Sequence, residues 1–205
     1  MLATHRGFDL GALAVARHLA AATGAPLLVS TTTRLLVDAN RSPHNRAVFS
    51  EWTRGLPAAQ RESLMASHHR PHWQRVRAAV AALRRGGARV VHVAVHSFTP
   101  VWHGVPREVD VGLLYDPARR AERALCRAWR NALRRQAPAL RVRCNAPYRG
   151  DSDSIGRALR RELPARAYLA LELELSQALL ASRAGCRRIA ESIVPALREA
   201  LASRT

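Results

Sequence analysis

The chain has 205 residues, 48% of them hydrophobic, so we expect one globular domain spanning 1–205 with a sizeable core. No apolar run is long enough for a transmembrane helix and the N-terminus lacks a signal-peptide pattern, so we expect a cytoplasmic protein without membrane contact. The three cysteines are odd in number and far apart, which argues against a disulfide framework and a thiolate zinc site.

The formal net charge is +18, from 33 basic and 15 acidic residues. A basic chain of this kind can bind nucleic acid. Every basic residue here is arginine, however, and the arginines are spread over helix faces without interleaved aromatic residues. A GC-rich coding sequence gives the same composition. We therefore expect no specific nucleic-acid partner, and weak, salt-dependent polyanion binding stays open as an alternative activity.

Helical and strand patterns alternate along the chain. In order, they predict a helix at 8–23 stopped by Gly24, a strand at 25–33, helices at 57–68 and 70–85, strands at 89–96 and 108–116, a helix at 118–136, a short strand at 140–145, a loop opening a helix at 150–163, a strand at 165–177 and a helix at 183–202. This order favours an α/β sheet layered between helices, in which ligands bind beyond the carboxyl ends of strands.

Polar residues stand at several of these strand ends. The apolar run "RVVHVAV" predicts a strand covered on both faces, and His96 follows it directly. On the strand at 165–177, Glu172 and Glu174 share the face opposite four leucines. Taken singly, each of these residues fits a structural or solvated role better than a catalytic one. Similar groups at other strand ends are Arg34, Asp38, Asn40, Arg41, Arg143, Asn145 and Tyr148.

Together these groups match the parts of a zinc hydrolase for acidic amides. An imidazole can bind zinc, which polarises a carbonyl and lowers the pKa of its bound water. A glutamate can take the proton of the water and pass it to the leaving amine. Arginine can hold a substrate carboxylate in two-point contact.

At these residues the sequence resembles the N-formylglutamate amidohydrolase family. The matching blocks occur in family order: "HRGFDLGALAVARHLA", "RLLVDANRS", "VHSFTPVWHGVPREVDVGLLYD", "RCNAPYRGDSDSIGRALR" and "LELELSQ". "HSFTP" followed by "REVDVGLLYD" is specific, whereas "VDxNR" also occurs in aspartoacylase-like relatives. The resemblance implies a zinc-exopeptidase-like fold, a three-layer α/β/α sandwich around a mixed central sheet. It also implies hydrolysis of an N-acyl amide of an acidic amino acid, such as N-formyl-L-glutamate giving formate and glutamate.

The resemblance further implies a role for each site residue. His96 would bind zinc, with Asp9 and His5 as further candidate ligands. Glu174 would be the general acid and base, and Arg34 would lie near the developing oxyanion. The residues that would bind or line the pocket for the small acidic substrate are Asn40, Arg41, Arg143 and Asn145.

One part of the family pattern is absent. Family members carry a "CEHA"- or "PHAG"-like block, with the first zinc-binding histidine, ahead of the "HRGFD" region, and this chain starts four residues before His5. Either the true start lies upstream, or the chain is a divergent member that binds an acidic small molecule without turnover. His92 cannot chelate one ion with His96, because about 13 Å of strand separates them. His68 and His72 lie one helical turn apart and could bind a metal, although a solvated helix face explains them better.

Overall fold

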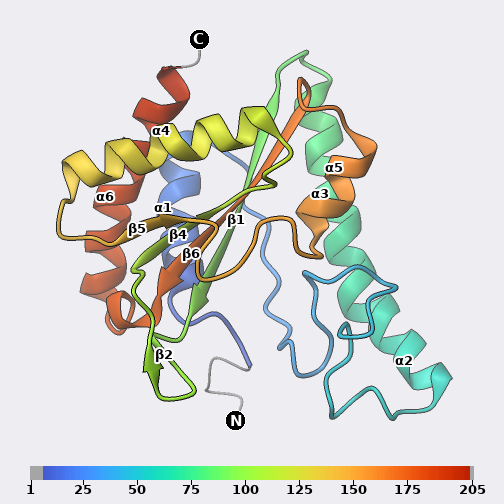
Figure 1. Ribbon diagram of the computed structural model, residues 1–205. Coiled ribbons are helices and arrows are strands. Elements are labelled where there is room, and N and C mark those ends of the chain that lie inside the picture. The colour runs from blue at the N-terminus through green and yellow to red at the C-terminus, as the bar shows by residue number, and fades with distance from the viewer. Residues whose placement is uncertain (1–6, 204–205) are drawn as a thin grey trace. The chain divides into compact units, whose positions relative to one another are not determined.

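The computed structural model describes residues 7–203 (Figure 1). They form two compact units that alternate along the sequence. The first, here called the loop unit, comprises 7–8, Leu28–Val90 and Ser152–Tyr168. The second, the sheet unit, comprises Asp9–Leu27, Val91–Asp151 and 169–203. No helix within 7–203 is both long enough and apolar enough to cross a membrane.

A four-stranded mixed sheet organises the fold. Strand β4 runs antiparallel to β6 and parallel to β5, with Leu113 opposite Leu173 and Cys144 in the two registers. The expected α/β class with a mixed central sheet is confirmed. The strands in sheet order are β1 (Val90–Phe98), β6 (Tyr168–Ser176), β4 (Val111–Leu114) and β5 (Val142–Cys144).

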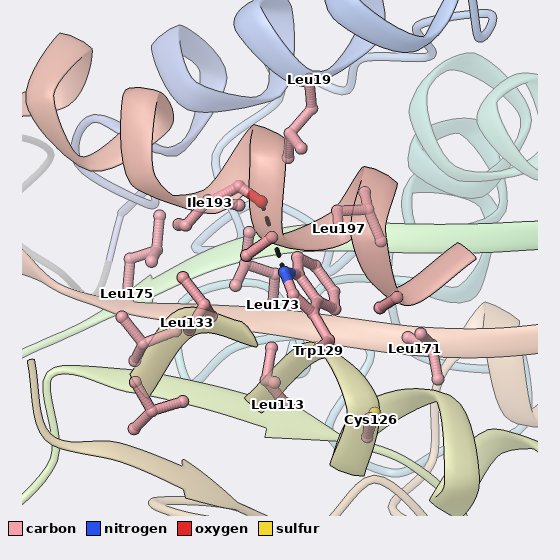
Figure 2. Close-up of a cluster of buried hydrophobic side chains, with 14 of the residues drawn as sticks. Leu19, Leu113, Cys126, Trp129, Leu133, Leu171, Leu173, Leu175, Ile193 and Leu197 are labelled. Atoms are coloured by element: carbon pink, nitrogen blue, oxygen red, sulfur yellow. Dashed lines mark hydrogen bonds between the residues drawn. The ribbon is translucent and has the colours of Figure 1, made fainter. Parts of the chain in front are cut away.

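Three helices of the sheet unit cover one face of the sheet: α1 (Ala12–Thr23), α4 (Arg120–Gln136) and α6 (Arg183–Ala202). All four leucines of β6 enter this core, as period-two alternation predicts, together with Trp129 (Figure 2). The indole Nε1 of Trp129 donates to the Ile193 carbonyl at 3.3 Å, which satisfies its polar edge inside the apolar core.

We expect Leu173→Ala to lower the free energy of unfolding by about 2–5 kcal/mol, because it leaves a cavity in the fully buried core. Leu27→Ala is the matched control. Leu27 is 39% exposed, and its truncation should cost less than about 0.5 kcal/mol. Denaturant unfolding followed by circular dichroism measures both values. Equal losses for the two variants would contradict this account of the core.

Strand β1 differs from its prediction. It lies at one edge of the sheet and is mostly half-exposed, so it is not covered on both faces. Val91, Val93 and Val95 pack against the core of the sheet unit. By strand alternation His92 and His96 therefore lie on the opposite face of the sheet.

The loop unit contains α2 (Ala58–Leu64), α3 (Arg70–Arg84) and α5 (Ile155–Glu162). The sequence predicts a break between two helices near residue 69. The structure instead joins α2 to α3 through a π-helical turn, Met65–His69, so the helix continues. An ion pair between Arg77 and Glu162 connects α3 to α5.

Two further local predictions are wrong, and one small element was missed. Residues 25–33 run as irregular chain, because the segment pairs with no strand within the described residues. Helix α1 begins at Ala12 rather than residue 8, because Gly11 takes a left-handed conformation with φ 72°. A small hairpin, β2 (Val101–Trp102) and β3 (Val105–Pro106), was not predicted.

Candidate functional site

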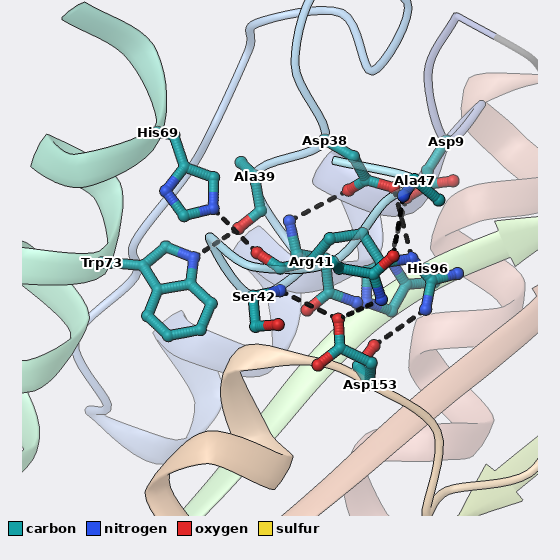
Figure 3. A network of polar contacts seen from close by, with 12 residues as sticks. Asp9, Asp38, Ala39, Arg41, Ser42, Ala47, His69, Trp73, His96 and Asp153 are labelled. Carbon is teal, nitrogen blue, oxygen red and sulfur yellow. Dashed lines mark hydrogen bonds and ion pairs between the residues drawn. The ribbon is translucent and has the colours of Figure 1, made fainter. Parts of the chain in front are cut away.

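Asp9 and His96 come together in the sheet unit although 87 residues separate them in sequence (Figure 3). Asp9 Oδ2 lies 2.9 Å from His96 Nδ1, and each side chain is 19% exposed. Asp9 sits just ahead of α1, and His96 near the end of β1. Both were candidate metal ligands in the sequence, and the structure makes them direct neighbours.

The surroundings of His96 favour a positive charge at its imidazole. Burial alone would lower the pKa of His96. The hydrogen bond and charge of Asp9, with the charges of Glu174 and Glu172, outweigh burial and raise the pKa to about 9. Three carboxylates thus act on one imidazole and favour its charged form.

Glu174 lies on the same face of the sheet as His96. Leu173 and Leu175 point into the core, so Glu174 points to the opposite face, where its side chain is buried with 6% exposed. Glu172 shares this face and is half-buried. Glutamates on strands usually face solvent, and Glu174 does not.

A row of three residues crosses the sheet at Glu174. Gly112 of β4 pairs with Glu174 on one side and with Arg143 of β5 on the other. A Cβ atom on Gly112 would stand 2.1 Å from the Ala146 carbonyl oxygen and 3.2 Å from the Glu174 Cβ. Glycine is required here because the loop after β5 passes directly over the strand. Arg143, on the exposed end of this row, shares its face with Glu174.

Asn145 shapes that loop. Its φ is 50°, and its side-chain Oδ1 accepts hydrogen bonds from the backbone N–H groups of Tyr115 and Gly150 at 3.0 and 3.2 Å. The amide oxygen of this predicted pocket residue is thus occupied in holding the loop after β5.

Arg34, Asn40 and Arg41, the other predicted site residues, belong to the loop unit. The Asn40 backbone N–H donates to Asp38 Oδ1 at 3.0 Å, forming a tight turn. Arg41 Nη1 donates to the Asp153 carbonyl at 2.8 Å, and its Nε lies 3.8 Å from Asp38 Oδ2. One hydrogen bond from Nη1 and a longer ion-pair contact at Nε therefore hold the guanidinium in the loop unit.

Asp153 was not recognised in the sequence, yet it holds this loop. Its Oδ2 accepts from the Ser42 backbone N–H at 2.9 Å and from Asn45 Nδ2 at 2.6 Å. Burial alone would raise the pKa of Asp153, but these hydrogen bonds and the charge of Arg41 outweigh it and lower the pKa. The "GDSDS" pattern predicted only a loop opening a helix, a signal too weak to find a partner 111 residues away.

Comparison with known proteins decides the family. A sequence model described as FGase, N-formylglutamate amidohydrolase, matches residues 1–181. The chain belongs to the N-formylglutamate amidohydrolase family. The resemblance seen in the sequence is confirmed, and membership supports amidohydrolase chemistry. No curated protein shows significant sequence similarity to the chain.

Two solved structures share the fold of this N-formylglutamate amidohydrolase family member. A gene product of Agrobacterium tumefaciens has 31% sequence identity and a TM-score of 0.84, over 98% of this chain and 81% of that one. An N-formylglutamate amidohydrolase from Ralstonia eutropha has 18% identity and a TM-score of 0.67, over 94% of this chain and 86% of that one.

The donor atoms of this amidohydrolase family member can be compared with the ligands that the expected zinc ion requires. The Asp9 carboxylate and the His96 imidazole are both zinc-binding groups, and they lie within hydrogen-bond distance of each other. Residues 7–203 contain no cluster of three or more histidine, cysteine, aspartate or glutamate side chains that could hold a metal. His5, the third candidate ligand, lies outside the described residues. The described donors thus fit two of the three protein ligands typical of catalytic zinc.

Proposed function

We propose that this chain hydrolyses the N-acyl amide of an acidic amino acid, with N-formyl-L-glutamate as the first substrate to test. One observation carries the proposal: in a member of this family, the buried Glu174 acts electrostatically on His96, which is itself paired with Asp9. The assay supplies N-formyl-L-glutamate to the purified chain and follows formate and free amine. Stoichiometric binding without product would favour the alternative, a family member that binds an acidic small molecule without turnover.

We further propose that His96 and Asp9 hold zinc. When bound, zinc supplies polarisation of an amide carbonyl and lowers the pKa of water. In the present geometry Asp9 contacts His96 at Nδ1. Carboxylates commonly orient zinc-binding histidines in this way, leaving Nε2 for the metal. Asp9 can therefore serve either as a ligand or as the group that orients His96.

Glu174 is the proposed proton carrier. A carboxylate that is largely out of water accepts a proton from the attacking water and delivers it to the amide nitrogen as the amine leaves. The loop after β5 leaves room only for glycine at position 112, beside Glu174. Arg34 is proposed to stabilise negative charge on the carbonyl oxygen.

Arg41, with Asn40, is proposed to bind the substrate carboxylate. Its Nη1 donates to the Asp153 carbonyl and its Nε lies 3.8 Å from Asp38 Oδ2, which restricts the guanidinium. A guanidinium restricted in this way can present its remaining donors to a carboxylate at a reduced cost in conformational entropy.

We expect Arg41→Ala to raise KM for N-formyl-L-glutamate about 10- to 100-fold while kcat changes little, because a charge-assisted hydrogen bond contributes about 1.5–3 kcal/mol. Arg46→Ala is the matched control, since Arg46 is an exposed arginine of the same loop. Steady-state kinetics on both variants gives the answer. An unchanged KM in Arg41→Ala would remove Arg41 from the substrate site.

A cytoplasmic location is proposed for this activity. Cys126, Cys144 and Cys186 are all free thiols, which is the usual state in a reducing compartment.

A further inference from the structure

We propose that His69 and Trp73 are positioning residues that hold the main chain beneath Arg41 in its substrate-binding geometry. His69 Nε2 lies 2.7 Å from the Arg41 carbonyl oxygen, and Trp73 Nε1 donates to the Ala39 carbonyl at 2.9 Å (Figure 3). The two rings thus contact the carbonyl oxygens of the residues directly before and after Asn40. The inference rests on the proposed role of Arg41, and all of these residues belong to the loop unit.

Burial makes His69 a specific donor. The side chain is fully buried, and its ring stacks on Trp73 with centroids 5.2 Å apart. A carbonyl oxygen only accepts, so the proton must lie on Nε2. Nδ1 has no hydrogen-bond partner among residues 7–203, and leaving a buried polar atom unpaired costs free energy. An apolar residue at this position would avoid this cost. The hydrogen bond from Nε2 to the Arg41 carbonyl therefore best explains why a histidine is buried here.

The π-helical turn presents His69 to the loop. Met65 and His69 stand at the two ends of this turn, and both are buried. Met65 packs with Val37 and Val48, which lie before and after the turn at 38–42 in sequence. The irregular turn therefore places an apolar and a polar contact on one segment, and such π turns are frequent at functional sites.

Burial favours the neutral form of the His69 imidazole. Burial lowers the pKa of His69. The hydrogen bond to Arg41 and the charge of Asp38 oppose this effect, and the charge of Arg70 adds to it. His72, the next imidazole on the helix, also has a pKa lowered by burial, by Arg75 and by His69. A neutral donor holds the Arg41 main chain without placing another positive charge beside its guanidinium.

Three variants test this positioning role through kinetics. His69→Leu removes the donor, and His69→Gln restores a side-chain N–H. His72→Leu removes a neighbouring imidazole whose Nδ1 has no hydrogen-bond partner among residues 7–203. KM for N-formyl-L-glutamate should rise about 10-fold in His69→Leu, with kcat within about twofold of wild type. His69→Gln should recover most of this loss, and His72→Leu should change neither constant. A rise in KM that is equal in all three variants would overturn the proposal.

A second readout needs no activity. Hydrogen exchange of the Asn40, Arg41 and Ser42 amides should quicken at least 10-fold in His69→Leu but not in His72→Leu, while amides of α4 stay protected. Unchanged exchange in His69→Leu overturns the proposal. If Arg41→Ala does not alter KM, the proposed function has lost its carboxylate-binding residue, and exchange alone then decides whether His69 holds the turn.

Trp73→Phe covers the case in which His69→Leu does not fold. It keeps an aromatic ring at this position while removing the indole N–H that donates to the Ala39 carbonyl. Exchange at Asn40 should quicken and KM should rise about threefold. A wild-type exchange rate at Asn40 together with a wild-type KM would overturn the positioning role of Trp73.

Discussion

Glu174→Gln is expected to lower kcat for N-formyl-L-glutamate by about 10²- to 10⁴-fold, the range typical of a lost general acid–base group. Glutamine has nearly the same shape but cannot accept and return a proton. Glu174 is buried and pairs with Gly112 of the neighbouring strand. A replacement of nearly the same shape should therefore leave the packing of β4 and β6 unchanged. The fold, measured by circular dichroism, and the metal content should both match wild type.

Glu172→Gln is the control for this experiment. Glu172 shares the sheet face of Glu174 and also acts on His96, but it is only half-buried. Its replacement should lower kcat by no more than about fivefold. A Glu174→Gln enzyme with near wild-type turnover would show that another group carries the proton.

The second large effect concerns zinc. The purified chain is expected to contain zinc near one equivalent by elemental analysis, and His96→Ala should lose nearly all of it. Asp9→Asn should weaken zinc binding about 10- to 100-fold if Asp9 orients His96, the usual cost of losing such a partner. A loss as complete as that of His96→Ala would identify Asp9 as a direct ligand.

His92→Ala serves as the matched control for zinc, because His92 lies on the same strand and face about 13 Å from His96. It should keep full zinc content. A wild-type chain that takes up no zinc when zinc is supplied would contradict the cofactor proposal. Binding of the substrate without hydrolysis would then be the better account of this family member.

Regular periodicity made much of the fold predictable. The alternating leucines of β6 and the amphipathic pattern of α6 (Arg183–Ala202) predict both elements closely, because each buries one continuous face. Residues 25–33 have strand-like composition but no pairing partner in the described sheet, and a strand requires one. Pairing is a property of the whole chain, so local composition could not show its absence.

The candidate site was predictable only in part. Strand alternation places Glu172 and Glu174 on one face, but the burial of Glu174 depends on a loop that crosses Gly112. The family resemblance named Asp9 and His96 separately, and only the fold makes them neighbours. The hydrogen bond between His69 and Arg41 depends on a π-helical turn that a 3.6-residue period does not anticipate.

The alternation of the two units along the sequence restricts how this protein can change. The chain passes from one unit to the other after Phe8, Leu27, Val90, Asp151 and Tyr168. Neither unit is a contiguous piece of gene, so neither can be exchanged as a cassette by recombination at its two ends. Point substitutions and short insertions are therefore a more accessible route to change in either unit than domain shuffling.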